Sequence, residues 1–263
     1  MQRFDLIVPV GVYCVTSWNL RKCGLQEESL PFDWASRVTL ESVIAFLEND
    51  FADFLKFDQL EFVEQKGKLY TFRSNNYLFP HDFHNEDPAI EYDEVITKYQ
   101  RRIERLKNKI QKAKKILFVH TTFGECPIED VKDVHKRMQA LFPKKKIKIL
   151  YLNTIRGKRG IDYTYRSSAL DVIDVEFGTN PEDPHDWHGH PEVFAEIFKK
   201  YGFSYRILFN KWVAEKRLNW KEQFKIGILK FRWKMIKLLT CFIPSQKTRK
   251  QLRERYKIEK AHR

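Results

Sequence analysis

The stretch FDLIVPVGVYCVTSWNLRKCG, residues 4–24, decides the fold expected for this chain. Residues 4–10 are rich in Ile, Val and Leu and are followed by Gly11, which is the pattern of a buried strand entering a turn. Nothing from residue 14 to residue 22 breaks a helix, and Arg21, Lys22 and Gly24 are typical of a helix end. The stretch therefore predicts a strand followed directly by a helix that begins at Cys14.

Cys14 is the candidate nucleophile because of this place at a helix start. A thiol reacts as its thiolate, and the N–H groups at a helix N-terminus favour the anion, so we expect a lowered pKa. The same N–H groups could hold an oxyanion. The alternative is a buried cysteine that only packs, which is how we interpret Cys23, Cys126 and Cys241.

Composition indicates a globular chain of one or two domains. It has 263 residues, of which 43% are hydrophobic and 14% aromatic, enough for a substantial core. The N-terminus lacks the pattern of a secretory signal, and four scattered cysteines suit a reducing cytoplasm. They form neither a disulfide framework nor a zinc pattern.

The net charge of +13 lies entirely in the C-terminal tail. Residues 211–263 hold 17 Lys and Arg against 4 Glu, whereas residues 1–210 hold 31 charges of each sign. We therefore predict two parts, a catalytic α/β domain at 1–210 and a basic tail at 211–263. Such a tail indicates an anionic surface as partner and argues against a nucleic-acid binder.

The rest of the body predicts an α/β fold. The spacing of strand, helix and strand over residues 116–152 favours parallel pairing, and residues 59–83 read as an antiparallel edge or hairpin. Strands are expected at 60–63, 69–72, 77–79, 116–120, 147–152 and 170–177, and helices at 39–47, 87–114, 127–141 and 191–201. We expect a mostly parallel central sheet.

The tail predicts a basic amphipathic helix. Apolar residues recur from 224 to 242 at alternating steps of four and three, with lysines off that stripe. The lysines exclude a membrane span, but the helix could lie in a membrane interface on anionic lipid, or the stripe could pack on the body. The expected membrane contacts are Trp220, Phe224, Ile228, Phe231, Trp233 and Met235.

Five segments together resemble a bacterial family described as papain-like cysteine peptidases. They are GVYCVTSWNLRKCGL (11–25), LPFDW (30–34), YLFPHDF (77–83), KYQRRIERL (98–106) and ILFVHTT (116–122), and the likeness covers about residues 5–155. The resemblance implies a papain-like α/β fold, permuted or reduced, with Cys14 as nucleophile and His81 as base. A related group is similar to capsule-biosynthesis acyltransferases, so the family label describes a fold more than a reaction.

A thiol nucleophile needs a base, and usually a group that orients the base. Spacing alone does not choose His81 over His84 or His120. Asp33 and Asp82 are the candidates for orienting the base, although Asp33 could equally cap the following helix.

Anion binding is expected from two basic segments. The candidates for binding substrate or phosphate are Arg101, Arg102, Arg105, Arg156 and Arg159, with Trp187 as a residue that could pack over a substrate pocket. Solvated salt bridges are the alternative for the arginines. No nucleotide-binding glycine motif is present, and we interpret the histidines at 185–190 as a polar loop without metal.

The ending CFIPSQKTRKQLRERYKI, residues 241–258, resembles the tails of lipopolysaccharide sugar transferases. The two resemblances together favour a cysteine-dependent acyl-transfer enzyme that acts on a cell-surface polysaccharide or lipid-linked glycan precursor. We expect it on the cytoplasmic face of the membrane, with no required cofactor and with acyl-CoA as one candidate donor. The alternatives are a papain-like peptidase or amidase, and a non-catalytic or glycosyltransferase-like component of glycan assembly.

Overall fold

The computed structural model describes residues 1–123, 126–156, 158, 160–177, 189–240, 245, 246, 248, 250 and 251. The chain divides into two units, Met1–Tyr205 and Arg206–Arg263, whereas the sequence places the boundary after residue 210. Each unit is described by itself.

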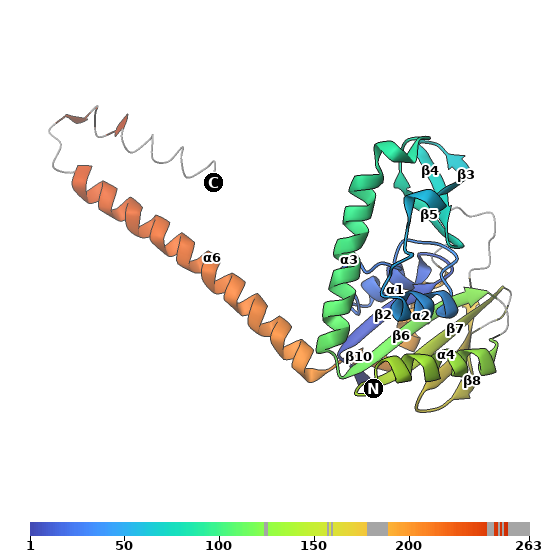
Figure 1. Ribbon diagram of the computed structural model, residues 1–263. Coiled ribbons are helices and arrows are strands. Elements are labelled where there is room, and N and C mark those ends of the chain that lie inside the picture. The colour runs from blue at the N-terminus through green and yellow to red at the C-terminus, as the bar shows by residue number, and fades with distance from the viewer. Residues whose placement is uncertain are drawn as a thin grey trace. The chain divides into compact units, whose positions relative to one another are not determined.

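The first unit is a mixed α/β fold around a five-stranded sheet of order β2-β6-β7-β9-β8 (Figure 1). Its strands are β2 (Leu6–Gly11), β6 (Lys115–Phe123), β7 (Lys146–Arg156), β9 (Leu170–Phe177) and β8 (Ile161–Arg166). The first four are mutually parallel, and only β8 pairs antiparallel, with β9. The prediction of a mostly parallel central sheet is confirmed.

Both faces of this sheet are covered. On one face, a buried cluster packs α2 (Leu40–Glu48), α3 (Tyr92–Lys112) and α4 (Ile128–Leu141) against the strands. On the other face, α1 (Val15–Lys22) and α5 (Pro191–Phe198) complete a second cluster. Strands covered on both faces are expected to be almost continuously apolar, as β2 is.

A smaller antiparallel sheet follows α2. It consists of β3 (Glu61–Lys66), β4 (Leu69–Ser74) and β5 (Tyr77–Phe83), as the sequence predicted, with a 3-10 turn at Phe57–Gln59 before it. Another 3-10 turn, Pro88–Ile90, leads into α3, so the α-helix begins at Tyr92 and not at Asp87. Figure 1 shows this small sheet beside the beginning of α3.

Three strands of the first unit were not predicted. The strand β8 has the alternating pattern of an edge strand, and β10 (Tyr201–Phe203) pairs with β1 (Gln2–Phe4) in a two-stranded parallel sheet. The strand β7 also extends to Arg156, beyond its predicted end at residue 152.

The second unit contains most of α6 (Tyr205–Thr240). Phe224, Ile228, Phe231 and Met235 are exposed on this helix. Their spacing of four, three and four residues places them along one side of it. No helix in the described part of the chain is long and apolar enough to cross a membrane.

Candidate active site

Cys14 lies in a turn between β2 and α1 that depends on Gly11. A Cβ atom at Gly11 would come within 2.6 Å of Thr16 Oγ1 and 2.9 Å of the Thr121 carbonyl oxygen. The turn is held to β6 by the Val12 N–H, which donates to that carbonyl oxygen at 3.1 Å. Glycine is therefore required for the close approach of the turn to β6.

Cys14 is the N-cap residue of α1, as predicted. Its carbonyl oxygen accepts the Trp18 N–H at 3.0 Å. In an α-helix this bond leaves the preceding amides, those of Val15, Thr16 and Ser17, without a partner inside the helix. In α-helices generally, such N-terminal amides can donate to an anion.

His81 is a base in contact with Cys14. The distance from Cys14 Sγ to His81 Nε2 is 3.7 Å, across 67 residues of sequence. His81 lies on β5, and backbone hydrogen bonds through Ser36 and Arg37 connect β5 to the turn that holds Cys14. Ser36 and Leu78 exchange backbone hydrogen bonds of 2.8 and 3.0 Å, and the next amide, that of Arg37, donates to the Val12 carbonyl oxygen at 2.9 Å.

The other histidines considered lie elsewhere. His84 Nδ1 is 3.4 Å from a carboxylate oxygen of Glu91. His120 is buried on β6, where its ring lies 4.9 Å from that of Tyr151. Burial lowers the pKa of His120 to about 3, so this side chain is neutral.

The electrostatics of Cys14 differ from the sequence prediction. Its side chain is buried, with the residue only 9% exposed. Burial raises the pKa of Cys14 to about 11; its own backbone N–H lowers the pKa, and the charges of Asp33 and Asp82 raise it further. Desolvation is the largest of these effects, so burial favours the neutral thiol.

Asp33 is buried, and its hydrogen bonds go to one of its two carboxylate oxygens. Its Oδ2 accepts from Arg21 Nη2 at 3.2 Å, from Gln26 Nε2 at 2.5 Å and from the Leu30 N–H at 3.0 Å. Its Oδ1 is buried and has no hydrogen-bond partner among the described residues. Burial raises the pKa of Asp33 to about 6, although these contacts lower it.

Asp82 faces away from His81, the residue that contacts the Cys14 thiol. Successive side chains of a strand point to opposite faces, and on β5 His81 is exposed where Asp82 is buried. Asp82 binds Lys98 Nζ at 2.6 Å and accepts the Tyr99 hydroxyl at 2.8 Å. In the described part of the chain, neither Asp33 nor Asp82 hydrogen-bonds the His81 ring. No direct contact therefore supports the prediction that one of them orients His81.

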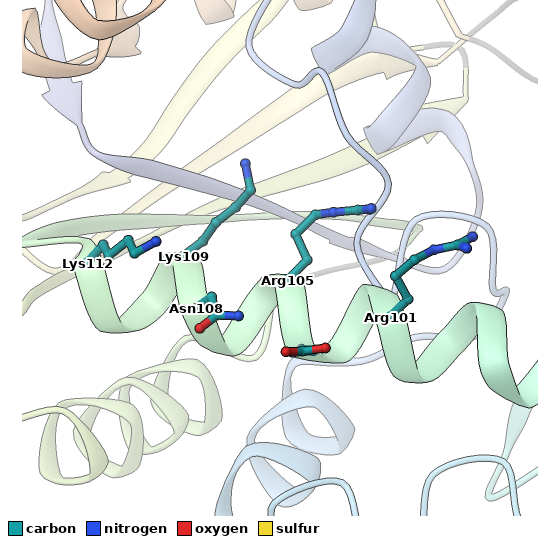
Figure 2. Close-up of a pocket in the computed structure, with 6 residues that line it drawn as sticks. Arg101, Arg105, Asn108, Lys109 and Lys112 are labelled. Atoms are coloured by element: carbon teal, nitrogen blue, oxygen red, sulfur yellow. The ribbon is translucent and has the colours of Figure 1, made fainter.

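Four cations line a shallow pocket along α3, of about 370 Å³, together with Glu104 and Asn108. In Figure 2, Arg101, Arg105 and Lys109 extend from the same side of the helix. Glu28 partly neutralises them, at 3.3 Å from Arg105 Nε and 2.6 Å from Lys109 Nζ. The fourth cation is Lys112.

The arginines predicted as one group are therefore divided. Arg101 and Arg105 line the pocket, but Arg102 lies over the Tyr99 ring at 4.9 Å. The sequence analysis missed Lys109 and Lys112, which continue the spacing of 101 and 105 along the helix. It also missed Arg21 and Gln26, which hold Asp33.

The remaining predicted residues lie on other elements or outside the described residues. Arg156 belongs to β7, and Arg159 and Trp187 lie outside the described residues. Lys158, which lies between Arg156 and Arg159 in the sequence, pairs with Asp174 at 2.8 Å. Five of the six tail residues are exposed on α6, namely Trp220, Phe224, Ile228, Phe231 and Met235.

The first unit is thus a mixed α/β domain with a thiol and an imidazole in contact, the pair of groups used by cysteine-nucleophile enzymes. The chain belongs to the family described as "Putative papain-like cysteine peptidase (DUF1796)", whose model matches residues 5–155. Cys14 and His81 both lie within this match. The description indicates an enzyme with a thiol nucleophile.

One curated relative is similar. It is "Uncharacterized protein R408" of Acanthamoeba polyphaga mimivirus, 28% identical over 144 residues. The match covers 47% of this chain and 64% of that protein. No solved structure matches the chain.

Proposed function

We propose that this protein is a cysteine-dependent acyltransferase that uses Cys14 as nucleophile and His81 as general base. The observation that carries the proposal is the 3.7 Å contact between Cys14 Sγ and His81 Nε2, two groups far apart in the sequence and both within the family match. The proposed acceptor is a hydroxyl group of a cell-surface polysaccharide or lipid-linked glycan precursor.

The neutral thiol determines the order of the proton transfers. As Cys14 Sγ attacks the donor's carbonyl carbon, its proton moves to His81 Nε2. The oxyanion is held by the amides that begin α1, and its collapse expels the leaving group, which takes the proton from His81. A hydroxyl of the acceptor then attacks the thioester while His81 takes its proton. The new ester leaves, and the proton returns to the sulfur.

The pocket on α3 supports a donor that carries phosphate. Four cations against Glu28 and Glu104 leave an excess of two positive charges, and arginine binds phosphate oxygens in a bidentate manner. Acyl-CoA is a donor of this kind. Pyrophosphate should raise the thermal midpoint of the wild-type protein but not of the double variant Arg101→Ala/Lys112→Ala; equal shifts in both would refute the site.

The tail supports a location at an anionic membrane. Its exposed aromatic residues and its excess of cations are the features that hold a helix in a lipid interface. The full chain should sediment with phosphatidylglycerol vesicles and not with phosphatidylcholine vesicles. The double variant Phe224→Asp/Phe231→Asp should lose this binding. Sedimentation that is unchanged in the variant would refute the role of these residues.

Trapping of the acyl-enzyme tests the proposed chemistry. The full chain is incubated with p-nitrophenyl acetate and analysed by mass spectrometry before and after digestion. An acetyl group on Cys14 that is absent in Cys14→Ser and strongly reduced in His81→Ala supports the proposal, with Cys23→Ser as the matched control. Absence of the adduct in the wild-type protein, or an adduct that does not depend on His81, refutes it. Loss of the adduct should be faster with a saccharide acceptor than in water.

The family description favours a second candidate function. The same pair of residues could hydrolyse a peptide or amide, with water in place of the acceptor hydroxyl. This alternative predicts turnover of peptide p-nitroanilides by the wild-type protein and no acceleration by saccharides. If both results are found, the peptidase replaces the acyltransferase.

A further inference from the structure

A row of polar side chains lies near the carboxyl ends of β6, β7 and β9. The strand register pairs Thr122 on β6 with Asn153 on β7, and Asn153 with Asp174 on β9. Residues that are paired in a parallel sheet direct their side chains to the same face of the sheet. We call Thr122, Asn153 and Asp174 the polar row.

The polar row lies on the face of the sheet that α2, α3 and α4 cover. Tyr151 precedes Asn153 by two residues and so points to the same face, and it belongs to the buried cluster that packs against those helices. The polar row therefore follows the apolar part of this face towards the carboxyl ends of the strands. In open parallel sheets, ligands bind outside the carboxyl ends of the strands.

Asn153 uses only one half of its side-chain amide. Its Nδ2 donates to Asp174 Oδ1 at 3.1 Å, and because a carboxylate only accepts, this contact fixes which atom of the amide is the oxygen. Asn153 is 3% exposed, and its Oδ1 has no hydrogen-bond partner in the described part of the chain. A buried acceptor without a partner is unfavourable, so we expect this oxygen to meet a donor from outside the chain.

A second buried group without a partner lies on the same face. His120 precedes Thr122 by two residues on β6 and is paired with Tyr151. It is 4% exposed, and its Nδ1 has no hydrogen-bond partner among the described residues. Two neighbouring strands therefore each direct one unsatisfied polar side chain to the same side of the sheet.

The charge of the polar row is already compensated. Asp174 Oδ2 binds Lys158 Nζ at 2.8 Å, and these two side chains are 18% and 25% exposed, so the polar row reaches solvent at Asp174. The groups left without partners, on Asn153 and on the neutral His120 ring, suit an uncharged ligand. A hydroxyl group both donates and accepts hydrogen bonds, and a saccharide carries several hydroxyl groups.

We infer that the polar row binds a saccharide, one hydroxyl group of which donates to Asn153 Oδ1. The inference rests on the proposed function in one respect, because it takes the bound saccharide to be the acceptor of the acyl group. Cys14 follows the carboxyl end of β2, which is parallel to β6 and next to it. The candidate nucleophile and the polar row therefore lie towards the same edge of the sheet. Binding of the saccharide itself does not require the Cys14 thiol.

Saturation-transfer NMR on the full chain tests the inference. The probes are glucose, galactose, mannose and N-acetylglucosamine, each at millimolar concentration, and at least one should receive saturation from the wild-type protein. Its dissociation constant should rise about fivefold in Asn153→Leu, because this change removes one neutral hydrogen bond at nearly constant side-chain size. Asn49→Leu is the matched control and should leave the constant unchanged. Asn49 also donates to an aspartate, Asp53, at 3.0 Å, but this contact is exposed.

A second variant keeps the test decisive if the first does not fold. His120→Phe removes the other unpartnered group and keeps a ring against Tyr151, and it should also weaken binding. Circular dichroism is recorded for each variant, and His120→Phe decides if Asn153→Leu is unfolded. Saturation transfer to none of the four saccharides overturns the inference. A dissociation constant that is the same in the wild-type protein and in both variants also overturns it, because water alone would then satisfy these groups.

The outcomes separate the inference from the proposed function. Saccharide binding should persist in Cys14→Ser. If binding depends on Asn153 but p-nitrophenyl acetate does not acylate Cys14, the proposed function fails and the saccharide site stands without a role in acyl transfer. If Cys14 is acylated but no saccharide binds, the inference is overturned while the nucleophile stands.

Discussion

Alkylation of Cys14 should show a thiol that is harder to ionise than a free cysteine. Burial raises the pKa of Cys14 from 9.0 to about 11. Two pKa units correspond to about 3 kcal/mol, and the thiolate fraction at pH 7 falls from about one in a hundred to about one in ten thousand. Iodoacetamide, which is neutral, should therefore modify Cys14 at a rate that rises about tenfold per pH unit through pH 10.

The assay uses the full chain, quenched at intervals between pH 5 and pH 10 and digested for mass spectrometry. Cys23 serves as an internal reference, because it is half-buried and its pKa is also raised by burial. In urea, the curve for Cys14 should bend near its ordinary pKa. Circular dichroism at each pH confirms that the native samples remain folded.

His81→Ala distinguishes a general base from a resting ion pair. If His81 receives the proton only during attack, the variant should change the iodoacetamide rate less than threefold but reduce acylation by about 10² to 10⁴. A rate plateau between pH 5 and pH 8 that disappears in His81→Ala would show a thiolate–imidazolium pair at rest. That result would refute the argument from desolvation.

Two buried titratable groups should make opposite contributions to stability in acid. The folded-state pKa of Asp33 is raised from 3.8 to about 6, so its proton-linked stabilisation is present below pH 4 and lost as the pH rises through 6. Asp33→Asn should consequently be about 3 kcal/mol less unfavourable at pH 7 than at pH 4, measured by urea unfolding; a pH-independent difference would contradict this. The pKa of His120 is lowered from 6.5 to about 3, so its contribution is present above pH 6.5 and lost as the pH falls towards 3. His120→Phe should remove about 5 kcal/mol of acid destabilisation. It also removes a buried Nδ1 that has no hydrogen-bond partner in the described part of the chain; acid unfolding at an unchanged midpoint would argue against burial as the cause.

Local sequence signals were sufficient for most of the fold. Thr39 forms the N-terminal cap of α2: its side chain accepts the Ser42 N–H, and the Ser42 side chain accepts the Thr39 N–H. Gly24 has the positive φ of a helix stop. Each of these features is decided within four residues. The strand β8 was missed because Asp162 and Thr164 interrupt its apolar residues, although Ile161, Tyr163 and Tyr165 alternate as an edge strand requires.

The site was less predictable because its properties depend on residues distant in sequence. The helix start at Cys14 was correct, but the direction of the pKa shift was not, since burial of the thiol depends on how separate segments pack around it. Asp82 was considered because it neighbours His81, yet neighbours on a strand face opposite ways. His81 was selected as the base because of the resemblance to a family and not because of its spacing in the sequence.

A buried and neutral thiol is consistent with transfer in preference to hydrolysis. Water competes with an acceptor hydroxyl for any thioester formed on Cys14, and a site that excludes water reduces this competition. The 9% exposure of Cys14 leaves little room for solvent at the sulfur, while the α3 cations offer contacts to a large donor. Raising the pKa of the thiol also prevents adventitious oxidation and alkylation, because these reactions require the thiolate. In the proposed mechanism Cys14 then depends on His81 for each turnover. The lifetime of an acyl group on Cys14 in water, compared with that in the presence of a saccharide, measures which reaction this arrangement serves.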